Sequence, residues 1–172
     1  YQVGFILQHY NDVKINNRIV WFKPNAQPNI TCRFFTESTE HLIWASKNGN
    51  GKKWKFNYDI SKNFEDRLNP KGKQTRNVWS IPLTPKSEKW AGEHPTQKPI
   101  ELLKRIILAC TSEGDTVLDP FLGSGTTSVV AKMLNRNSIG MELNKKYLPI
   151  INKRLNPPQK ILNQEAEINI VE

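Results

Sequence analysis

The sequence predicts an α/β protein whose mostly parallel sheet carries helices on both faces. Apolar residues recur at helical spacing over residues 100–110, and apolar runs then alternate with helical patterns as far as residue 155. The turn Gly123-Ser-Gly125 joins one apolar run to a helix, and Glu142 ends the next apolar run. This order of strand, turn, helix and strand is typical of parallel strands linked by crossover helices.

The first part of the chain predicts short strands separated by irregular segments. Residues 17–22 and 41–45 are rich in β-branched and aromatic side chains, and the two prolines of residues 23–29 impose a loop between them. Residues 56–58 and 77–81 are weaker strand candidates.

Regular structure is expected again after residue 99. Pro99 suits the first turn of a helix over residues 100–110, which Glu113-Gly-Asp115 ends. Val117 and Leu118 then begin a strand that we expect to be buried. The elements predicted to follow are a helix to about residue 134, a strand over 138–143, a helix over 144–155 and a turn at Asn156-Pro-Pro-Gln159.

The charge of the chain favours a polyanionic partner. The formal net charge is +9, and residues 47–89 hold eleven Lys or Arg against four acids, so +7 of it falls in that segment. Nucleic acid is the usual partner of such a surface, and charge alone does not separate DNA from RNA. The alternative is a solvated, flexible insert.

Several classes of protein are disfavoured by what the sequence lacks. It has no apolar run long enough for a membrane span and no secretory leader, so we expect a soluble, cytoplasmic protein without membrane contact. Cys32 and Cys110 lie far apart and the three histidines are scattered, so we expect no metal site and no disulfide framework. Both cysteines are expected to be buried structural thiols.

The glycine turn indicates a site for a nucleoside cofactor. Gly123 and Gly125 let the backbone approach a ligand closely, and the helix from Thr126 offers N–H groups to a phosphate or a carboxylate. The lysine of a phosphate-binding P-loop is absent, because Thr126 and Thr127 follow Gly125. Glu142 is placed to accept hydrogen bonds from a ribose. These residues leave both a nicotinamide dinucleotide and S-adenosylmethionine open.

Several segments in order resemble the β-class amino-group DNA methyltransferases. They are Trp21-Phe-Lys-Pro-Asn-Ala-Gln-Pro-Asn29, Arg33-Phe-Phe35, Glu40-His-Leu-Ile-Trp44, His94-Pro-Thr-Gln-Lys-Pro99, Asp119-Pro-Phe-Leu-Gly-Ser-Gly-Thr-Thr127, Gly140-Met-Glu142 and Tyr147. The resemblance implies a Rossmann-like S-adenosylmethionine-dependent methyltransferase fold, incomplete at its N-terminus. It also implies methyl transfer to an exocyclic amino group of adenine or cytosine in double-stranded DNA, within a restriction–modification system.

The resemblance also assigns the binding residues. Residues 119–127 would bind the methionine end of S-adenosylmethionine, Glu142 the ribose, and residues 94–98 would close over the cofactor, with Lys98 near its carboxylate. The expected cofactor residues are His94, Thr96, Gln97, Lys98, Asp119, Pro120, Phe121, Gly123, Ser124, Gly125, Thr126, Thr127 and Glu142. The expected DNA-binding residues are Lys23, Asn25, Arg33, Lys52, Lys53, Lys55, Lys71, Lys73 and Arg76.

The family's catalytic segment, an Asp, Asn or Ser followed by Pro-Pro and an aromatic residue, is absent. In the family's order it lies upstream of Tyr1, so no catalytic residue is assigned within this chain. Two alternatives stay open. The chain is a catalytically incomplete fragment or half of a split enzyme, with a complementing N-terminal half or a homodimer as partner, or it is a nicotinamide-dependent oxidoreductase.

The resemblance suggests four regions. Residues 1–46 belong to the catalytic domain, and residues 47–93 form a basic target-recognition insert that faces DNA. Residues 94–155 form the S-adenosylmethionine-binding half of the catalytic domain, and residues 156–172 form a tail.

Overall fold

The computed structural model describes residues 6, 7, 9, 13–47 and 54–158. The chain divides into two compact units, unit 1 with Tyr1–Leu83 and Lys104–Thr111, and unit 2 with Thr84–Leu103 and Ser112–Glu172. The predicted boundaries at residues 47, 94 and 156 stay predictions. Among the helices within the described ranges, none combines the length and apolar composition needed to cross a membrane.

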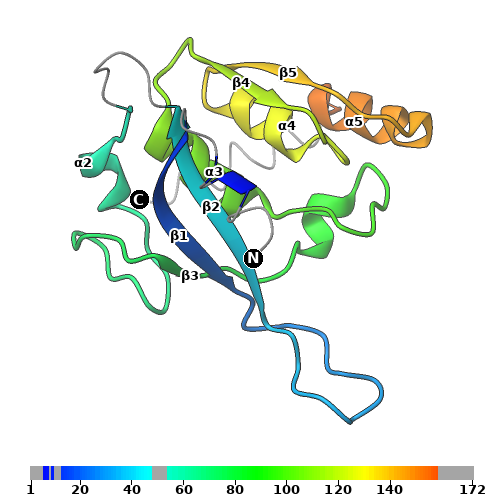
Figure 1. Cartoon of the computed structure of the whole chain (residues 1–172). Helices are drawn as coiled ribbons and strands as arrows, with labels where there is room; N and C mark the ends of the chain where they lie inside the picture. Colours follow the sequence, from blue (N-terminus) through cyan, green and yellow to red (C-terminus); the bar gives the residue numbers. More distant parts are fainter. Residues whose placement is uncertain (1–5, 8, 10–12, 48–53, 159–172) are drawn as a thin grey trace. The chain divides into compact units, whose positions relative to one another are not determined.

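Unit 1 is built on a three-stranded sheet in the order β2-β1-β3 (Figure 1). β1 (Val13–Phe22) pairs antiparallel with β2 (Thr39–Lys47), and parallel with β3 (Val78–Ser80). A bulge interrupts the β1–β2 register between Ile15 and Asn17. The strands predicted within residues 17–22, 41–45 and 77–81 are therefore confirmed.

The core of unit 1 joins this sheet to helix α3 (Ile100–Cys110) through buried aromatic rings. Trp21 is 2% exposed, and its indole nitrogen donates to the carbonyl of Ile81 at 2.6 Å. The guanidinium of Arg105, on α3, lies 5.7 Å from the ring of Phe64 and 5.8 Å from that of Trp79. Arg105 and the rings of Phe64 and Trp79 therefore form one cluster.

A buried ion pair completes that cluster. Arg105 Nη1 donates to Asp66 Oδ2 at 2.6 Å, and the second terminal nitrogen donates to the carbonyl of Glu65 at 2.8 Å. Burial alone would raise the pKa of Asp66. Hydrogen bonds from the Leu68 amide, Arg105 and Asn69 outweigh it and hold the pKa below its usual range.

The strand predicted for residues 56–58 is wrong. Tyr58 begins the short helix α2 (Tyr58–Ser61), and Phe56 and Asn57 are irregular. The amide nitrogen of the Asn57 side chain donates to the carbonyls of Leu108 and Thr111, both at 2.7 Å. This segment is therefore held by the carbonyls left unpaired at the end of α3, and not by pairing with a strand.

Unit 2 contains the predicted parallel pair and its crossover helix. β4 (Thr116–Asp119) and β5 (Asn137–Gly140) are parallel, with Asp119 opposite Gly140, and α4 (Thr126–Met133) connects them. The short 3₁₀ turns are η1 (Lys86–Lys89) and η2 (Lys145–Tyr147), and α5 (Leu148–Leu155) follows η2. Helices over residues 100–110, to about 134 and over 144–155 are confirmed, the last with η2 as its first turn.

Three expectations about burial and length are wrong. Leu118 is 60% exposed and its register partner Ile139 is 54% exposed, because alternate side chains point to opposite faces and α4 packs on only one. β5 ends at Gly140 and not at residue 143. Cys32 is exposed in a left-handed turn with φ 53°, whereas Cys110 is partly buried and burial raises the pKa of its thiol.

Candidate functional site

The turn between β4 and α4 is fixed at both ends by one carboxylate. Asp119 Oδ1 accepts from the amide of Phe121 at 3.0 Å, and Oδ2 accepts from the hydroxyl of Thr127 at 2.6 Å. The side chain at the end of the strand therefore holds the first residues of the turn and the first turn of α4. We name residues 119–127 the glycine loop.

Two glycines of this loop occupy conformations that side chains rarely adopt. Gly123 has φ 57°, and a Cβ there would lie 3.3 Å from His94 Nε2. Gly125, at the start of α4, has φ 82°, and its Cβ would lie 3.4 Å from Ile151. The positive backbone angle favours glycine at both positions, and at Gly123 a side chain would also crowd His94.

Glu142, expected to lie by the loop, does contact it. Its Oε2 accepts from the amide of Gly123 at 2.8 Å, and its Oε1 accepts from the amide of Asn144 at 2.7 Å. Gly140 permits the loop to lie this close, since a Cβ there would meet Leu122 at 2.6 Å. The structure thus brings the two parts of the predicted site together.

His94 packs over the glycine loop from the other predicted segment. Its ring lies 4.1 Å from the ring of Tyr147, at an interplanar angle of 53°. Its Nδ1 accepts from the amide of Thr96 at 3.3 Å, which requires an unprotonated Nδ1. Burial lowers the pKa of His94, an effect that Glu142 opposes and Lys146 reinforces. The ring is therefore held neutral against the loop.

Arg154 supports the loop, although it was not among the residues predicted from the sequence. This side chain of α5 is 5% exposed, and its Nη1 donates to the carbonyl and hydroxyl of Ser124, both at 3.0 Å, and to Thr126 Oγ1 at 2.8 Å. Arg154 lies three residues after the buried Ile151, so both side chains are on the inner face of the amphipathic helix α5. This spacing in the sequence could have predicted a buried arginine.

The predicted cofactor residues differ in how their side chains are placed. Gln97, Ser124 and Thr126 are buried and form hydrogen bonds within the protein: Gln97 Nε2 donates to the carbonyl of Glu88 at 2.9 Å, and Thr126 Oγ1 to that of Lys98 at 3.1 Å. Their side chains support the site. Phe121, by contrast, is 89% exposed, and Pro120 and Thr96 are also exposed.

The predicted DNA-binding residues all belong to unit 1. Arg33, Lys55, Lys71, Lys73 and Arg76 are exposed, whereas Lys52 and Lys53 lie outside the described residues. Lys23 pairs with Glu40 at 3.4 Å, and its side chain is only 12% exposed. Asn25 Oδ1 accepts from the amide of Leu83 at 2.8 Å. Lys23 and Asn25 are therefore engaged with the protein.

Unit 1 also contains a largely apolar cavity of about 240 Å³ between its sheet and α3. Ile19, Trp44, Phe56 and Ile106 line it, and among the predicted site residues that the structure describes only Arg76 does. Within the described ranges no group of three or more His, Cys, Asp or Glu could hold a metal ion.

The geometry defines a class of site. A glycine loop follows a parallel strand, and the first N–H groups of α4 lie behind this loop. An acid that follows the next strand, Glu142, lies at the edge of the loop. Such a loop accepts the anionic end of a nucleoside cofactor, and the acid can accept hydrogen bonds from hydroxyl groups.

Comparison with known proteins identifies the family. The model of the DNA methylase family of N6- and N4-methyltransferases matches residues 2–153, and the chain belongs to this family. It is 53% identical over 156 residues to the type II methyltransferase M2.LlaDCHI of Lactococcus lactis subsp. cremoris, an alignment that covers 91% of this chain and 56% of that protein. It is 54% identical over 155 residues to the type II methyltransferase M2.DpnII of Streptococcus pneumoniae. This alignment covers 90% of this chain and 56% of that protein.

Solved structures confirm the α/β methyltransferase fold. The crystal structure of the M1.HpyAVI–SAM complex matches with a TM-score of 0.68 and 32% identity, covering 89% of this chain and 69% of that one. The cytosine-N4-specific PvuII DNA methyltransferase has the same TM-score, and the match covers 98% of this chain and 61% of that one. Its sequence identity is 20%, so this match shows likeness of fold alone. The chain spans a little over half the length of the curated relatives, so activity does not follow from likeness alone.

Proposed function

We propose that this chain forms the cofactor-binding and DNA-contacting part of an S-adenosylmethionine-dependent DNA methyltransferase. The enzyme would transfer a methyl group to an exocyclic amino group of adenine or cytosine, within a restriction–modification system. The observation that carries the proposal is the glycine loop, with Glu142 at its edge and His94 over Gly123. The names of the type II relatives and of the SAM-bound M1.HpyAVI complex support it.

The side chains suggest a role for each part of the site. The methionine carboxylate of S-adenosylmethionine suits the N–H groups at the start of α4, because a helix N-terminus favours an anion. Glu142 would accept hydrogen bonds from the ribose hydroxyls while still facing Gly123. The neutral ring of His94, backed by Tyr147, would cover the loop and exclude water. Lys98 would lie near the carboxylate.

The DNA partner is proposed from the charge of unit 1. The exposed cations Arg33, Lys55, Lys71, Lys73 and Arg76 suit phosphate contacts. Chemical activation of the amino group is not assigned to any residue of this chain. A binding module that needs a complementing half or a second copy of the chain is the second candidate.

Calorimetry on the full-length protein tests the cofactor. We expect S-adenosylmethionine to bind in preference to a nicotinamide dinucleotide. Glu142→Ala should weaken binding by about 1–3 kcal/mol, because the ribose hydroxyls lose their acceptor. Glu113→Ala, an exposed acid of the same unit, is the matched control and should leave the affinity unchanged. If S-adenosylmethionine does not bind, the proposal is wrong.

Methyl transfer separates the two candidates. Isotope-labelled S-adenosylmethionine is incubated with duplex DNA and the protein, and the methylated nucleoside is identified by mass spectrometry. N6-methyladenine or N4-methylcytosine in the DNA supports the enzyme. Binding of cofactor and DNA without transfer supports the binding module.

A further inference from the structure

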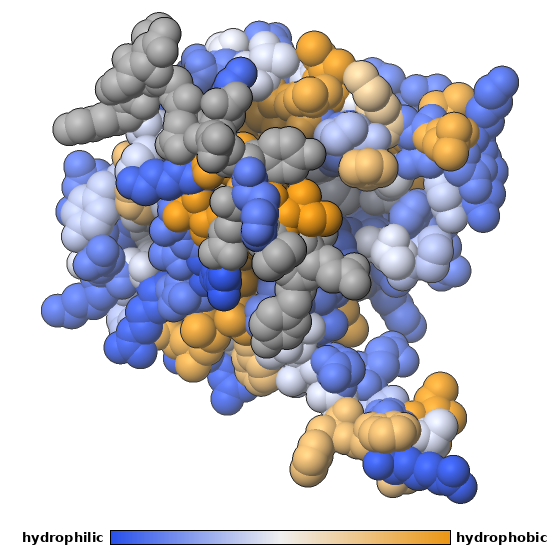
Figure 2. All heavy atoms as spheres, viewed as in Figure 1, coloured by the Kyte–Doolittle hydropathy of each residue, from blue (hydrophilic) through white to orange (hydrophobic). Residues whose placement is uncertain are grey.

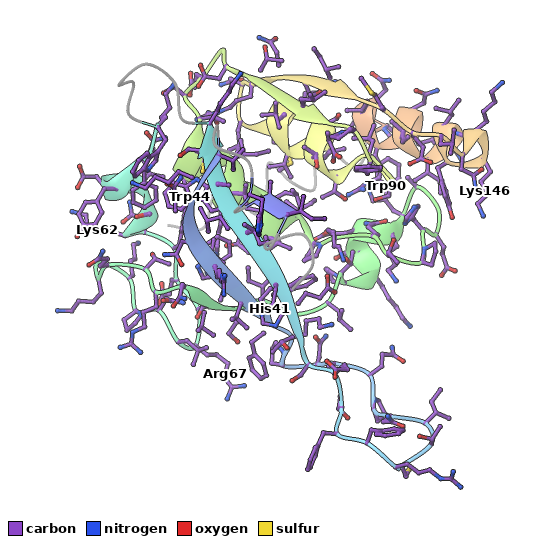
Figure 3. The ribbon with its side chains drawn as sticks, viewed as in Figure 1. His41, Trp44, Lys62, Arg67, Trp90 and Lys146 are labelled. Carbon is purple, nitrogen blue, oxygen red and sulfur yellow. The ribbon has the colours of Figure 1, made fainter. Side chains whose placement is uncertain are left out.

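Three aromatic side chains lie half exposed at every second position of residues 54–58 in unit 1. Trp54, Phe56 and Tyr58 are 43%, 42% and 44% exposed. The ring of Phe56 lies 5.0 Å from that of Trp44 and 6.5 Å from that of Tyr58. We name Trp54, Phe56 and Tyr58 the aromatic row; Trp44, which supports it, is labelled in Figure 3.

The segment that carries the row is anchored through the residue between its second and third rings. The backbone amide of Asn57 donates to the carbonyl of Ala109 at 2.8 Å, and its side chain donates to the carbonyls of Leu108 and Thr111. These hydrogen bonds hold Asn57 against the end of α3, while Phe56 and Tyr58, on either side of it, are 42% and 44% exposed. The two exposed rings are therefore carried by an anchored backbone.

Two lysine side chains lie close to rings of the aromatic row. Lys14 Nζ lies 4.8 Å from the ring centre of Trp54, and Lys62 Nζ lies 5.1 Å from that of Tyr58. Lys62 also pairs with Asp59 at 2.6 Å, and Lys55 stands between Trp54 and Phe56 in the sequence. Figure 3 shows Lys62 and Trp44 on the same side of unit 1. The row is therefore both aromatic and cationic.

This combination favours nucleic acid over a protein partner. The centre of a protein–protein interface is depleted of charged residues, whereas two of these three rings carry a lysine at cation–π distance. Proteins bind unpaired nucleic acid through aromatic rings that stack on the bases and through neighbouring cations that face the phosphates. Paired bases inside a duplex stack on one another and do not offer their faces to a side chain.

We propose that the aromatic row binds unpaired bases of a DNA strand by stacking, with Lys14 and Lys62 close to the flanking phosphates. The proposal rests on the proposed DNA methyltransferase function and deepens it. It adds a contact to the bases themselves, whereas the cations discussed above are proposed to contact phosphates. Its specific consequence is a preference for a strand that retains its bases over one that lacks them.

Fluorescence anisotropy on the full-length protein tests this preference. The probes are a labelled single-stranded DNA oligonucleotide, the duplex of the same sequence and the same strand with abasic sites. The variants are Trp54→Ala with Tyr58→Ala, and Trp54→Phe with Tyr58→Phe, which keeps both rings. Leu68→Ala, an apolar residue of unit 1 that is 39% exposed, is the matched control.

We expect the alanine pair to weaken single-strand binding by about fivefold or more per ring, and the phenylalanine pair to retain most of the affinity. The wild type should bind the abasic strand more weakly by a similar factor, and the alanine pair, in which only Phe56 remains of the row, should distinguish the two strands less than the wild type does. The salt dependence should stay unchanged, because no phosphate contact is removed.

Equal affinity for the normal and abasic strands, or an alanine pair with unchanged binding, would overturn the proposal. A changed oligomeric state with unchanged DNA affinity would also overturn it and would assign the row to a protein interface. Calorimetry with S-adenosylmethionine keeps the two questions separate. If the wild-type protein does not bind S-adenosylmethionine but still distinguishes the normal strand from the abasic strand, the methyltransferase function is rejected and the stacking site is not.

Discussion

At the scale of single residues, carboxylates and amides decide the shape of the site. Asp119 fixes both ends of the glycine loop, and Glu142 holds the amide of Gly123. The residue types and their spacing predicted that Asp119, Gly123 and Glu142 would meet, because strands of a parallel pair end at the same edge. Sequence spacing did not reveal that Glu142 would bond to the loop itself, since that contact depends on the close packing of Gly140 against Leu122.

His94 gives a prediction at this scale. Its pKa is lower than the usual 6.5 because of burial, so folding favours the neutral ring. The stability that this ring contributes is fully present above pH 6.5 and is lost as the pH falls through the lowered pKa. We expect ¹⁵N NMR shifts of the ring to titrate below 6.5. Tyr147→Ala should move the titration upward by uncovering the ring.

Tyr147→Phe serves as the control, because it keeps the covering ring and should leave the titration in place. A His94 that titrates at 6.5 or above in the wild type would contradict the assignment of a neutral ring over the loop.

At the scale of elements, the later half of the chain was the more predictable. Helices α3 and α4 and strand β4 follow from regular apolar spacing and from glycines at their ends. Residues 56–58 were misassigned because aromatic residues suggest a strand, whereas Asn57 pairs with the end of a helix some fifty residues away in sequence. Such tertiary hydrogen bonds leave no local pattern.

Arg154 gives the prediction for helix α5. Arg154→Met removes three hydrogen bonds to Ser124 and Thr126 and should lower the free energy of unfolding by about 1.5–3 kcal/mol. It should also weaken S-adenosylmethionine binding, since the start of α4 loses its support. Thermal denaturation and calorimetry below the melting temperature measure the two effects.

Lys153→Met removes the same charge from an exposed neighbour on α5 and is the matched control. Equal effects of the two substitutions would show that charge, and not the contact with the loop, is responsible.

At the scale of the whole molecule, charge and exposure separate the two units. The exposed cations expected to contact DNA belong to unit 1, and the glycine loop with its supports belongs to unit 2. Composition predicted the basic segment but not the apolar surface of unit 1. Ile30, Phe34 and Phe35, on the loop between β1 and β2, are 96%, 77% and 98% exposed, and Figure 2 shows apolar side chains on this projecting loop.

The basic surface predicts strong salt dependence of DNA binding. Each phosphate contact releases counterions, so the affinity should fall linearly on a logarithmic plot against salt concentration. Replacing Lys71 and Lys73 together with Met should reduce the slope by about two, roughly one per lysine. Lys132→Met and Lys153→Met, in unit 2, should leave it unchanged.

Filter binding or anisotropy over a range of salt concentrations provides the slope. An affinity that stays flat between low and moderate salt would reject phosphate contacts as the main source of binding.

The carboxylate bonds of the glycine loop have a consequence for the thermodynamics of association. With Asp119 and Glu142 already holding the backbone of the loop, its conformational entropy is lost when the chain folds and not when a ligand arrives. A ligand that enters a preorganised loop binds with a smaller entropic penalty and without waiting for the backbone to order. Association would then be limited by encounter and by displacement of solvent, and the loop would have the same shape in the free and bound protein.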